Sequence, residues 1–228
     1  MTAEVEPVVV EVAVAAPVEV VWQSLRDPEL IRQWHGWRYD GLDAEIDLIY
    51  HRDTQADEAA HTLQLGDGDR FELRGSTDGT VVRLVRAPYV EGSEWGDYYP
   101  EITEGWLTFL HQLKLLHEGN SGRPRRTIYL SGSGQPGAWS ALVDSAPTRV
   151  GRVAYEAQYQ RGVELPDLGP GLLIVGEKPT APQHGGQPSA ATAIVTSYGQ
   201  DDDQFAAAVA EWVAWWRSGY PESEPPQV

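Results

Sequence analysis

The chain contains no cysteine and a single methionine. The absence of cysteine excludes a disulfide framework, a thiolate metal site and a cysteine nucleophile. The sequence also lacks an apolar run long enough to span a membrane, and it has no basic-then-apolar segment at its start. We therefore expect a cytoplasmic protein that does not insert into a membrane.

Positive charge is scarce in this chain. Its 228 residues include 17 lysines and arginines against 34 aspartates and glutamates, which gives a formal net charge of −17. Such a balance disfavours any partner that carries many phosphates, so we expect no nucleic-acid binding. The acidic residues are spread over several loops, which is typical of a solvated surface that keeps a protein in solution.

Apolar residues are plentiful by comparison and follow regular patterns. Hydrophobic residues make up 41% of the chain and include nine tryptophans, enough to fill a core. Residues 8–14 alternate valine with other residues, which predicts a strand with one buried face. Pro17 suits the first turn of a helix over residues 18–26, and Asp27-Pro28 ends that helix and begins a second short one.

Shorter alternating patterns follow the two helices. Residues 45–50, 62–65 and 71–74 each alternate apolar with polar side chains, and Asp-Gly pairs at 67–68 and 78–79 are hairpin signals. Residues 103–118 then carry an apolar stripe at helical spacing. A helix with so wide an apolar face must lie across a sheet. The pattern predicts an α+β fold in which an antiparallel sheet wraps around a long helix.

Three separated segments resemble one known family in the right order. They are Ala16–Pro28 with Trp34-His35-Gly36-Trp37, the hairpin of residues 68–84, and the helix that begins at Gly105. Together they resemble the helix-grip fold of the START-like (SRPBCC) superfamily, and most of all the branch named after activators of the ninety-kilodalton heat-shock chaperone ATPase. The resemblance covers residues 5–119. It implies a helix-grip domain over residues 1–119, with a ligand-binding gap between the sheet and the long helix.

The second half of the chain repeats parts of this pattern. Residues 120–126 predict a linker. Beyond it, the spacing of Trp139, Leu142 and Asp144 matches an opening helix of the first half, and residues 205–216 match the stripe of the long helix. We interpret residues 127–219 as a smaller, degenerate second copy, with chance similarity of amphipathic helices as the alternative. Residues 220–228 are rich in proline and glutamate and predict a disordered tail.

Two local motifs point to cofactor or metal chemistry, and neither is adopted. Residues 132–137 match the glycine spacing of a dinucleotide-binding turn, but no alternation of strands and helices follows from which to build a parallel sheet. A flexible turn is the preferred interpretation. His51, His61 and Asp53 leave open a site with two histidines and one carboxylate, although histidines on a surface meander are far commoner. We predict no cofactor and no metal.

Polar side chains on strand faces are further candidates. His61 shares a predicted strand face with Leu63 and Leu65, where it would orient a ligand, move a proton, or serve as a hydrogen-bonded structural histidine. Arg83 and Arg86 lie on opposite faces of the next strand but one, so one of them should point towards the helix. An inward arginine needs a partner, either a ligand anion or an acidic side chain at the cavity rim.

Large aromatic residues complete the candidate ligand site. Trp34 and Trp37 flank Gly36, near the expected mouth, and the long helix contributes further apolar residues. Filling of the core is the competing interpretation for each of them. The full set of predicted ligand-binding residues is Trp34, Trp37, Tyr50, His61, Phe71, Arg83, Trp106, Phe109 and Leu110.

The resemblance implies that the protein binds a small apolar or amphipathic molecule without catalysing a reaction. Three alternatives stay open: an enzyme of the cyclase or dehydratase kind known on this fold, a chaperone-associated protein, and a homodimer that meets through Trp212, Trp215 and Trp216. We find no serine elbow, no defensible Ser/His/Asp order and no diagnostic carboxylate pair. The identity of the ligand does not follow from the sequence.

Overall fold

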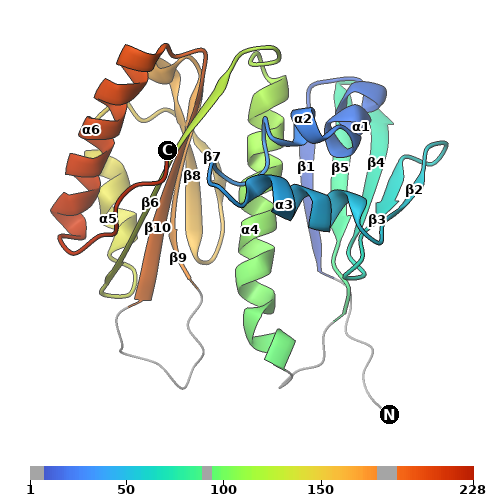
Figure 1. Ribbon diagram of the computed structural model, residues 1–228, viewed down its shortest axis with the longest axis horizontal. Coiled ribbons are helices and arrows are strands. Elements are labelled where there is room, and N and C mark those ends of the chain that lie inside the picture. Colours follow the sequence, from blue (N-terminus) through green and yellow to red (C-terminus); the bar gives the residue numbers. More distant parts are fainter. Residues whose placement is uncertain (1–7, 89–93, 179–188) are drawn as a thin grey trace. The chain divides into compact units, whose positions relative to one another are not determined.

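A computed structural model describes residues 8–88, 94–178 and 189–228 (Figure 1). The chain forms two compact units, each of which is treated by itself. Unit 1 comprises residues 1–36 and 40–118, and unit 2 comprises residues 37–39 and 119–228. Within the described ranges, no helix is both long enough and apolar enough to cross a bilayer.

Unit 1 opens as its sequence pattern predicts. Strand β1 (Val9–Val14) alternates exposed and buried residues, and helices α1 (Val18–Arg26) and α2 (Pro28–Ile31) follow. Asp27 caps α2, because its side chain accepts a hydrogen bond of 2.9 Å from the backbone N–H of Glu29.

An antiparallel sheet forms the body of unit 1. Its strand order is β1-β5-β4-β3-β2, so the first strand pairs with the last. The remaining strands are β2 (Gln55–Asp57), β3 (Thr62–Gln64), β4 (Arg70–Ser76) and β5 (Gly79–Val85). Helix α4 (Glu94–His117) packs on β1 (Figure 1). It buries Trp106, Leu110 and Leu113. The prediction of an α+β fold with an antiparallel layer is confirmed.

One predicted strand of unit 1 is wrong. Residues 45–50 fall in helix α3 (Leu42–Ile46) and in η1 (Asp47–His51), a turn of π-helix. Ile46 and Tyr50 are buried four residues apart, as on one face of a helix, whereas Leu48 between them is 55% exposed. Apolar residues at positions 46 and 50 fit both the two-residue period of a strand and the i, i+4 spacing of a helix. Alternation alone therefore does not distinguish the two structures here.

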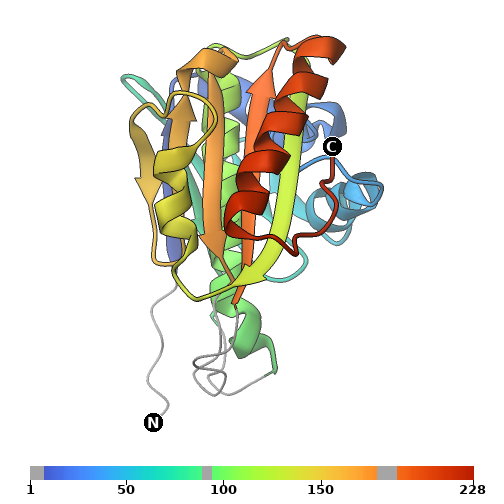
Figure 2. The ribbon, with the colours of Figure 1, turned by 90° about the vertical axis from the view of Figure 1, so that its left-hand side faces the viewer.

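Unit 2 contains a second antiparallel sheet with a helix, α6 (Asp202–Gly219), across one face (Figure 2). Its strand order, β6-β10-β9-β8-β7, again pairs the first strand with the last. Descent from a common ancestor as a degenerate copy stays a prediction, but the two strand orders agree. The other elements are β6 (Arg125–Gly134), α5 (Trp139–Leu142), η2 (Val143–Ser145), β7 (Val153–Glu156), β8 (Gln160–Leu165), η3 (Pro166–Leu168), β9 (Gly171–Glu177) and β10 (Ser189–Tyr198).

The tryptophans of α6 lie in the core of unit 2. Trp212, Trp215 and Trp216 are 1%, 6% and 1% exposed, and the indole N–H of Trp215 donates to the carbonyl of Leu142 at 3.1 Å. A homodimer that meets through these three residues is therefore not supported, because their rings are already buried in the core of unit 2. The apolar stripe was identified correctly, but its partner is the sheet of the same unit.

The C-terminal tail is ordered against β6, contrary to the prediction of disorder. Gln227 exchanges both backbone hydrogen bonds with Tyr129, and the N–H of Glu224 donates to the carbonyl of Ser131. β6 is an edge strand of its sheet, so its outer row of backbone groups is open to such pairing. Backbone hydrogen bonds fix the tail on β6, although its composition, rich in proline and glutamate, predicts disorder.

The glycine motif of residues 132–137 has a packing explanation. Gly132 and Gly134 lie within β6, and a Cβ atom at these positions would come within 2.9 and 2.6 Å of the Tyr220 side chain. Tyr220 follows α6 and stacks on Trp216 with 4.4 Å between ring centroids. The glycines make room for this ring on the sheet. Residues 132–134 are thus strand, residues 135–137 form the bend and turn that follow it, and the two strand glycines serve packing within unit 2.

This packing predicts that Gly134→Val destabilises unit 2. The added side chain would collide with the Tyr220 ring, and overpacking of this kind costs about 1–3 kcal/mol of unfolding free energy. Urea unfolding would measure the change. Ser133→Ala is the matched control, since Ser133 is the exposed neighbour in the same strand and its substitution should cost less than about 0.5 kcal/mol. Equal stabilities of the two variants would contradict the proposed contact.

His111 on helix α4 should make the stability of unit 1 depend on pH. Burial, with a smaller contribution from Lys114, lowers the pKa of His111 from 6.5 to about 4. Between these values the unfolded chain binds the proton and the folded chain does not, so stability present above pH 6.5 is lost as the pH falls. The full difference is worth about 3 kcal/mol, and we expect about 2 kcal/mol because His111 keeps some contact with solvent.

Urea unfolding at a series of pH values would test this expectation. His111→Gln should flatten the loss of stability on acidification. A smaller slope should remain, because burial also lowers the pKa of His117. An unchanged slope in the His111 variant would contradict the assignment.

Candidate functional site

An aromatic cluster occupies the interior of unit 1. Tyr50 from η1, Phe71 from β4 and Trp106 from α4 are almost fully buried, with centroids 5.4 Å apart for Phe71 and Trp106 and 6.3 Å apart for Tyr50 and Phe71. Trp34 meets Tyr50 edge-on at 5.8 Å, and its indole N–H donates to the carbonyl of Ser24 at 2.8 Å. Elements far apart in sequence thus bring together the predicted residues Trp34, Tyr50, Phe71, Trp106, Phe109 and Leu110.

His35 lies among these rings and was missed by sequence reasoning. Its side chain is fully buried, and its backbone N–H donates to the carbonyl of Ile31 at 2.8 Å, one turn earlier. The imidazole lies 4.2 Å from the half-buried ring of Phe109, centroid to centroid. After it, Gly36 adopts a positive φ of 56°, which lets the chain turn away. A polar ring is thereby held inside an otherwise aromatic cluster.

His35 connects a buried phenol to a partly exposed carboxylate. The hydroxyl of Tyr50 is 2.9 Å from Nδ1, and Oε1 of Glu45 is 3.6 Å from Nε2. Tyr50 is fully buried, whereas the Glu45 side chain is 33% exposed. We call Glu45, His35 and Tyr50 the polar array. It is an ordered series of a carboxylate, an imidazole and a hydroxyl, in which the imidazole and the hydroxyl are within hydrogen-bond distance and the carboxylate lies at ion-pair distance.

Burial sets the protonation of the phenol in the polar array. It raises the pKa of Tyr50 well above its usual value of 10, and the negative charge of Glu45 adds to this effect. Tyr50 therefore carries its proton at neutral pH. A neutral hydroxyl beside an imidazole can donate a hydrogen bond to it and accept one from elsewhere.

A second buried polar group involves Arg86, the inward member of the predicted pair. Its Nε is 2.7 Å from Oδ2 of Asp69, and its Nη1 donates to both the hydroxyl of Thr103 and the carbonyl of Tyr99. Burial raises the pKa of Asp69, while the N–H of Ala87 and the charge of Arg86 act in the opposite direction. Arg86 joins the sheet to α4, and we interpret it as a structural anchor.

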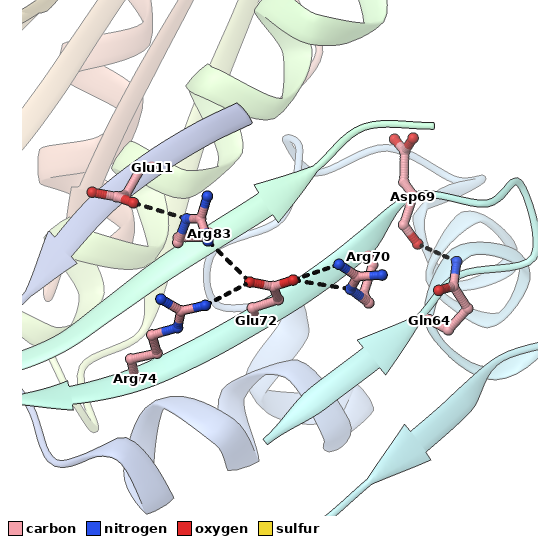
Figure 3. Close-up of polar contacts among 7 residues, drawn as sticks. All are labelled: Glu11, Gln64, Asp69, Arg70, Glu72, Arg74 and Arg83. Atoms are coloured by element: carbon pink, nitrogen blue, oxygen red, sulfur yellow. Dashed lines mark hydrogen bonds and ion pairs between the residues drawn. The ribbon is translucent and has the colours of Figure 1, made fainter. Parts of the chain in front are cut away.

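Arg83 lies on the outer face of the sheet, so its assignment to the ligand site is wrong. It faces Glu11 of β1 at 3.0 Å and Glu72 of β4 at 3.1 Å, and Arg70 and Arg74 contact the same Glu72 (Figure 3). Hydrogen bonding from Arg70, above all, lowers the pKa of Glu72. Side chains alternate across a strand, so the register that turns Val82 and Leu84 inward turns Arg83 outward.

His61 does not join the aromatic cluster through a strand face either. It precedes β3 with a φ of +50°, and its ring meets Trp22 edge-on at 5.6 Å between centroids. Leu63 and Leu65 are buried as predicted, but the left-handed backbone at His61 breaks the alternation. Among the described residues, no three metal-ligating side chains of the kind considered for His51, His61 and Asp53 come together.

Trp37 belongs to unit 2 and not to the ligand site of unit 1. Its indole stacks on Tyr129 at 4.0 Å and 11°, and its N–H donates to the side chain of Gln227 at 2.7 Å. The backbone N–H of Arg38 donates to the hydroxyl of Thr127 at 2.8 Å. The prediction that Trp37 lies at a pocket mouth is therefore wrong, because β6 and the tail offer its ring a flat aromatic partner.

Comparison with known proteins adds little to this geometry. No protein-family model matches the chain, and no curated protein matches it. Among solved structures, DynU16, a protein of the dynemicin biosynthetic locus, is 18% identical with a TM-score of 0.37, over 95% of this chain and 97% of the other. The di-domain ARO/CYC StfQ from the steffimycin biosynthetic pathway is 12% identical with a TM-score of 0.35, over 94% and 98%.

A third solved structure matches a part of the chain. Protein MLL2253 from Mesorhizobium loti is 20% identical with a TM-score of 0.35, over 49% of this chain and 96% of the other. Identities and scores this low do not assign an activity. The resemblance to the branch of heat-shock ATPase activators stays a prediction, and function is argued from the residues of this chain.

Substitution of Arg86 should destabilise unit 1 far more than substitution of Arg83. Arg86→Met leaves Asp69 buried without its charge partner, which should cost about 3–5 kcal/mol of unfolding free energy. Arg83→Met is the matched control, since it removes a partly exposed ion-pair member and should cost about 1 kcal/mol or less. Urea unfolding of both variants would measure this. A cost for Arg83→Met that equals or exceeds that of Arg86→Met would contradict the anchor role.

Proposed function

We propose that unit 1 binds a small apolar or amphipathic molecule beside the aromatic cluster, with the polar array fixing its orientation. One observation carries the proposal: a phenol and an imidazole lie, fully buried, among aromatic rings. Ligand sites combine a mostly apolar, aromatic lining with a few polar groups in set positions. Because Tyr50 and His35 hydrogen-bond to each other, the fold holds both polar groups inside the aromatic cluster at a reduced desolvation cost.

The order of elements in unit 1 supports membership of the helix-grip class. A strand, two short helices, a meander and a long helix follow one another, and the first strand pairs with the last. We propose on this basis that unit 1 is a START-like (SRPBCC) domain, in which ligands bind between the sheet and the long helix. Phe109 is half-buried, so its side of the cluster is the natural approach to His35.

The enzyme alternative is the second candidate, and the polar array is the observation that favours it. A carboxylate, an imidazole and a hydroxyl in succession form a group that can accept and pass on a proton, which is the chemistry an enzyme needs in addition to binding. Association with a chaperone and dimerisation stay predictions for which the described residues supply no contact.

Binding of 4-nitroanisole, a small neutral aromatic ether, would test the proposed function. A nitroaromatic compound close to Trp34 and Trp106 should quench tryptophan fluorescence in a saturable way. Phe109→Leu should weaken binding about three- to tenfold, because it removes one aromatic contact of about 0.5–1.5 kcal/mol. Phe205→Leu in helix α6 is the matched control and should bind as tightly as the unmodified protein. Absence of saturable quenching, or equal weakening by both substitutions, would overturn the proposal.

A further inference from the structure

The polar array runs from a solvent-facing carboxylate to a fully buried hydroxyl. Glu45 lies on α3 with a third of its side chain exposed, His35 follows α2, and Tyr50 lies on η1. The separations are 3.6 Å between the carboxylate and Nε2, and 2.9 Å between Nδ1 and the hydroxyl. Three groups of different chemistry thus occupy successive positions along one path.

The carboxylate decides how the imidazole carries its proton. A negative charge close to Nε2 favours a hydrogen on that nitrogen, which leaves Nδ1 as an acceptor. With this tautomer, the Tyr50 hydroxyl, 2.9 Å from Nδ1, is the donor to that nitrogen. The phenol oxygen can then accept a hydrogen bond from a ligand that lies beside the aromatic cluster. A carboxylate that orients a histidine, which in turn accepts from a hydroxyl, is the logic of an activated triad.

We propose that the polar array is a general-base relay that removes the proton of a phenol or enol hydroxyl in a ligand of unit 1. The inference rests on the proposed function, since the ligand must reach Tyr50. The ligand O–H bond breaks and its proton bonds to the Tyr50 oxygen. The original Tyr50 proton moves to Nδ1 of His35. The products are a ligand oxyanion and an imidazolium, so one proton is transferred and total charge is conserved.

The burial of the polar array gives this transfer its direction. The transfer leaves a negative ligand oxygen, a positive imidazolium and a negative Glu45 in succession, and attraction between such charges is stronger inside a protein than in water. Tyr50 itself is never left ionised, in accord with its protonated state in the apolar interior. Tyr50 is the catalytic residue because it contacts the ligand, while His35 and Glu45 are positioning residues that act through it.

The opposite effect is expected if the polar array merely stabilises the fold. An apolar site without a relay disfavours the charged form of a bound phenol, because burial penalises charge. A relay favours the charged form. The direction in which binding shifts the ionisation of a phenol therefore separates the two roles.

Binding of 4-nitrophenol would measure this direction, since its phenolate absorbs visible light and the phenol does not. At a fixed pH near neutrality, we expect the ratio of phenolate to phenol to be about tenfold higher for the bound probe than for the free probe, a shift of one pKa unit. Quenching of tryptophan fluorescence measures binding independently. The ether 4-nitroanisole, which has no proton to give, should bind without any change in absorbance.

Variants of the polar array should separate proton transfer from binding. Tyr50→Phe keeps the ring but removes the hydroxyl, so the phenolate ratio of bound 4-nitrophenol should fall below that of the free probe, with the bound fraction taken from tryptophan quenching. Glu45→Gln, at a partly exposed position, should lose most of the increase in that ratio. Asp47→Asn is the matched control: this exposed carboxylate on η1 pairs with Arg52 outside the polar array, and its loss should change neither readout.

The outcomes distinguish the relay from the binding site. Binding of both probes with no rise in phenolate would overturn the relay and leave the proposed function standing. A rise in phenolate that survives Tyr50→Phe and Glu45→Gln would also overturn it. If neither probe binds the unmodified protein, the proposed function fails, and the relay fails with it.

Discussion

The antiparallel pairing of β1 with β5 is the contact on which unit 1 depends. It joins residues as distant as Val12 and Val82 and aligns their inward side chains on one apolar face. Helix α4 covers this face with Trp106 and Leu110, and each fully buried side chain of this size contributes about 1.5–3 kcal/mol. The aromatic cluster is built on the same stripe of α4. Without the pairing, α4 would have no surface to cover and the polar array no enclosure.

The Arg86–Asp69 pair and the polar array differ in how completely hydrogen bonds within the fold use their polar atoms. Arg86 and Asp69 meet each other, a backbone amide, a hydroxyl and a carbonyl, so their polar atoms serve to hold α4 on the sheet. The polar array instead leads from the surface into the aromatic cluster. An ion pair whose hydrogen bonds are all made fixes structure. A carboxylate, an imidazole and a hydroxyl in succession can instead pass a proton from one group to the next. For this reason the polar array, and not the Arg86–Asp69 pair, is the basis of the proposed function.

Much of the fold, but less of the site, follows from local patterns in the chain. The alternation of β1, the hairpin of β4 and β5 and the stripes of α4 and α6 are read correctly, because burial of one face imposes a period on the sequence. The segment that contains Tyr50 was misread as a strand, and the spacing of the glycines in β6 resembled a nucleotide turn. Two different structures satisfy the first pattern equally well, whereas the second led to the prediction of a flexible turn where residues 132–134 are strand.

The sequence by itself determined the α+β class, the antiparallel layers and most of the aromatic residues of the cluster. Only tertiary structure decided that Arg86 and not Arg83 points inward, that Trp37 stacks on Tyr129, and that His35 meets Glu45 and Tyr50. Periodicity reports that a residue has a buried face, because water excludes apolar groups wherever the chain folds. It does not report which distant side chain lies opposite, since that depends on strand register and on how separate elements pack.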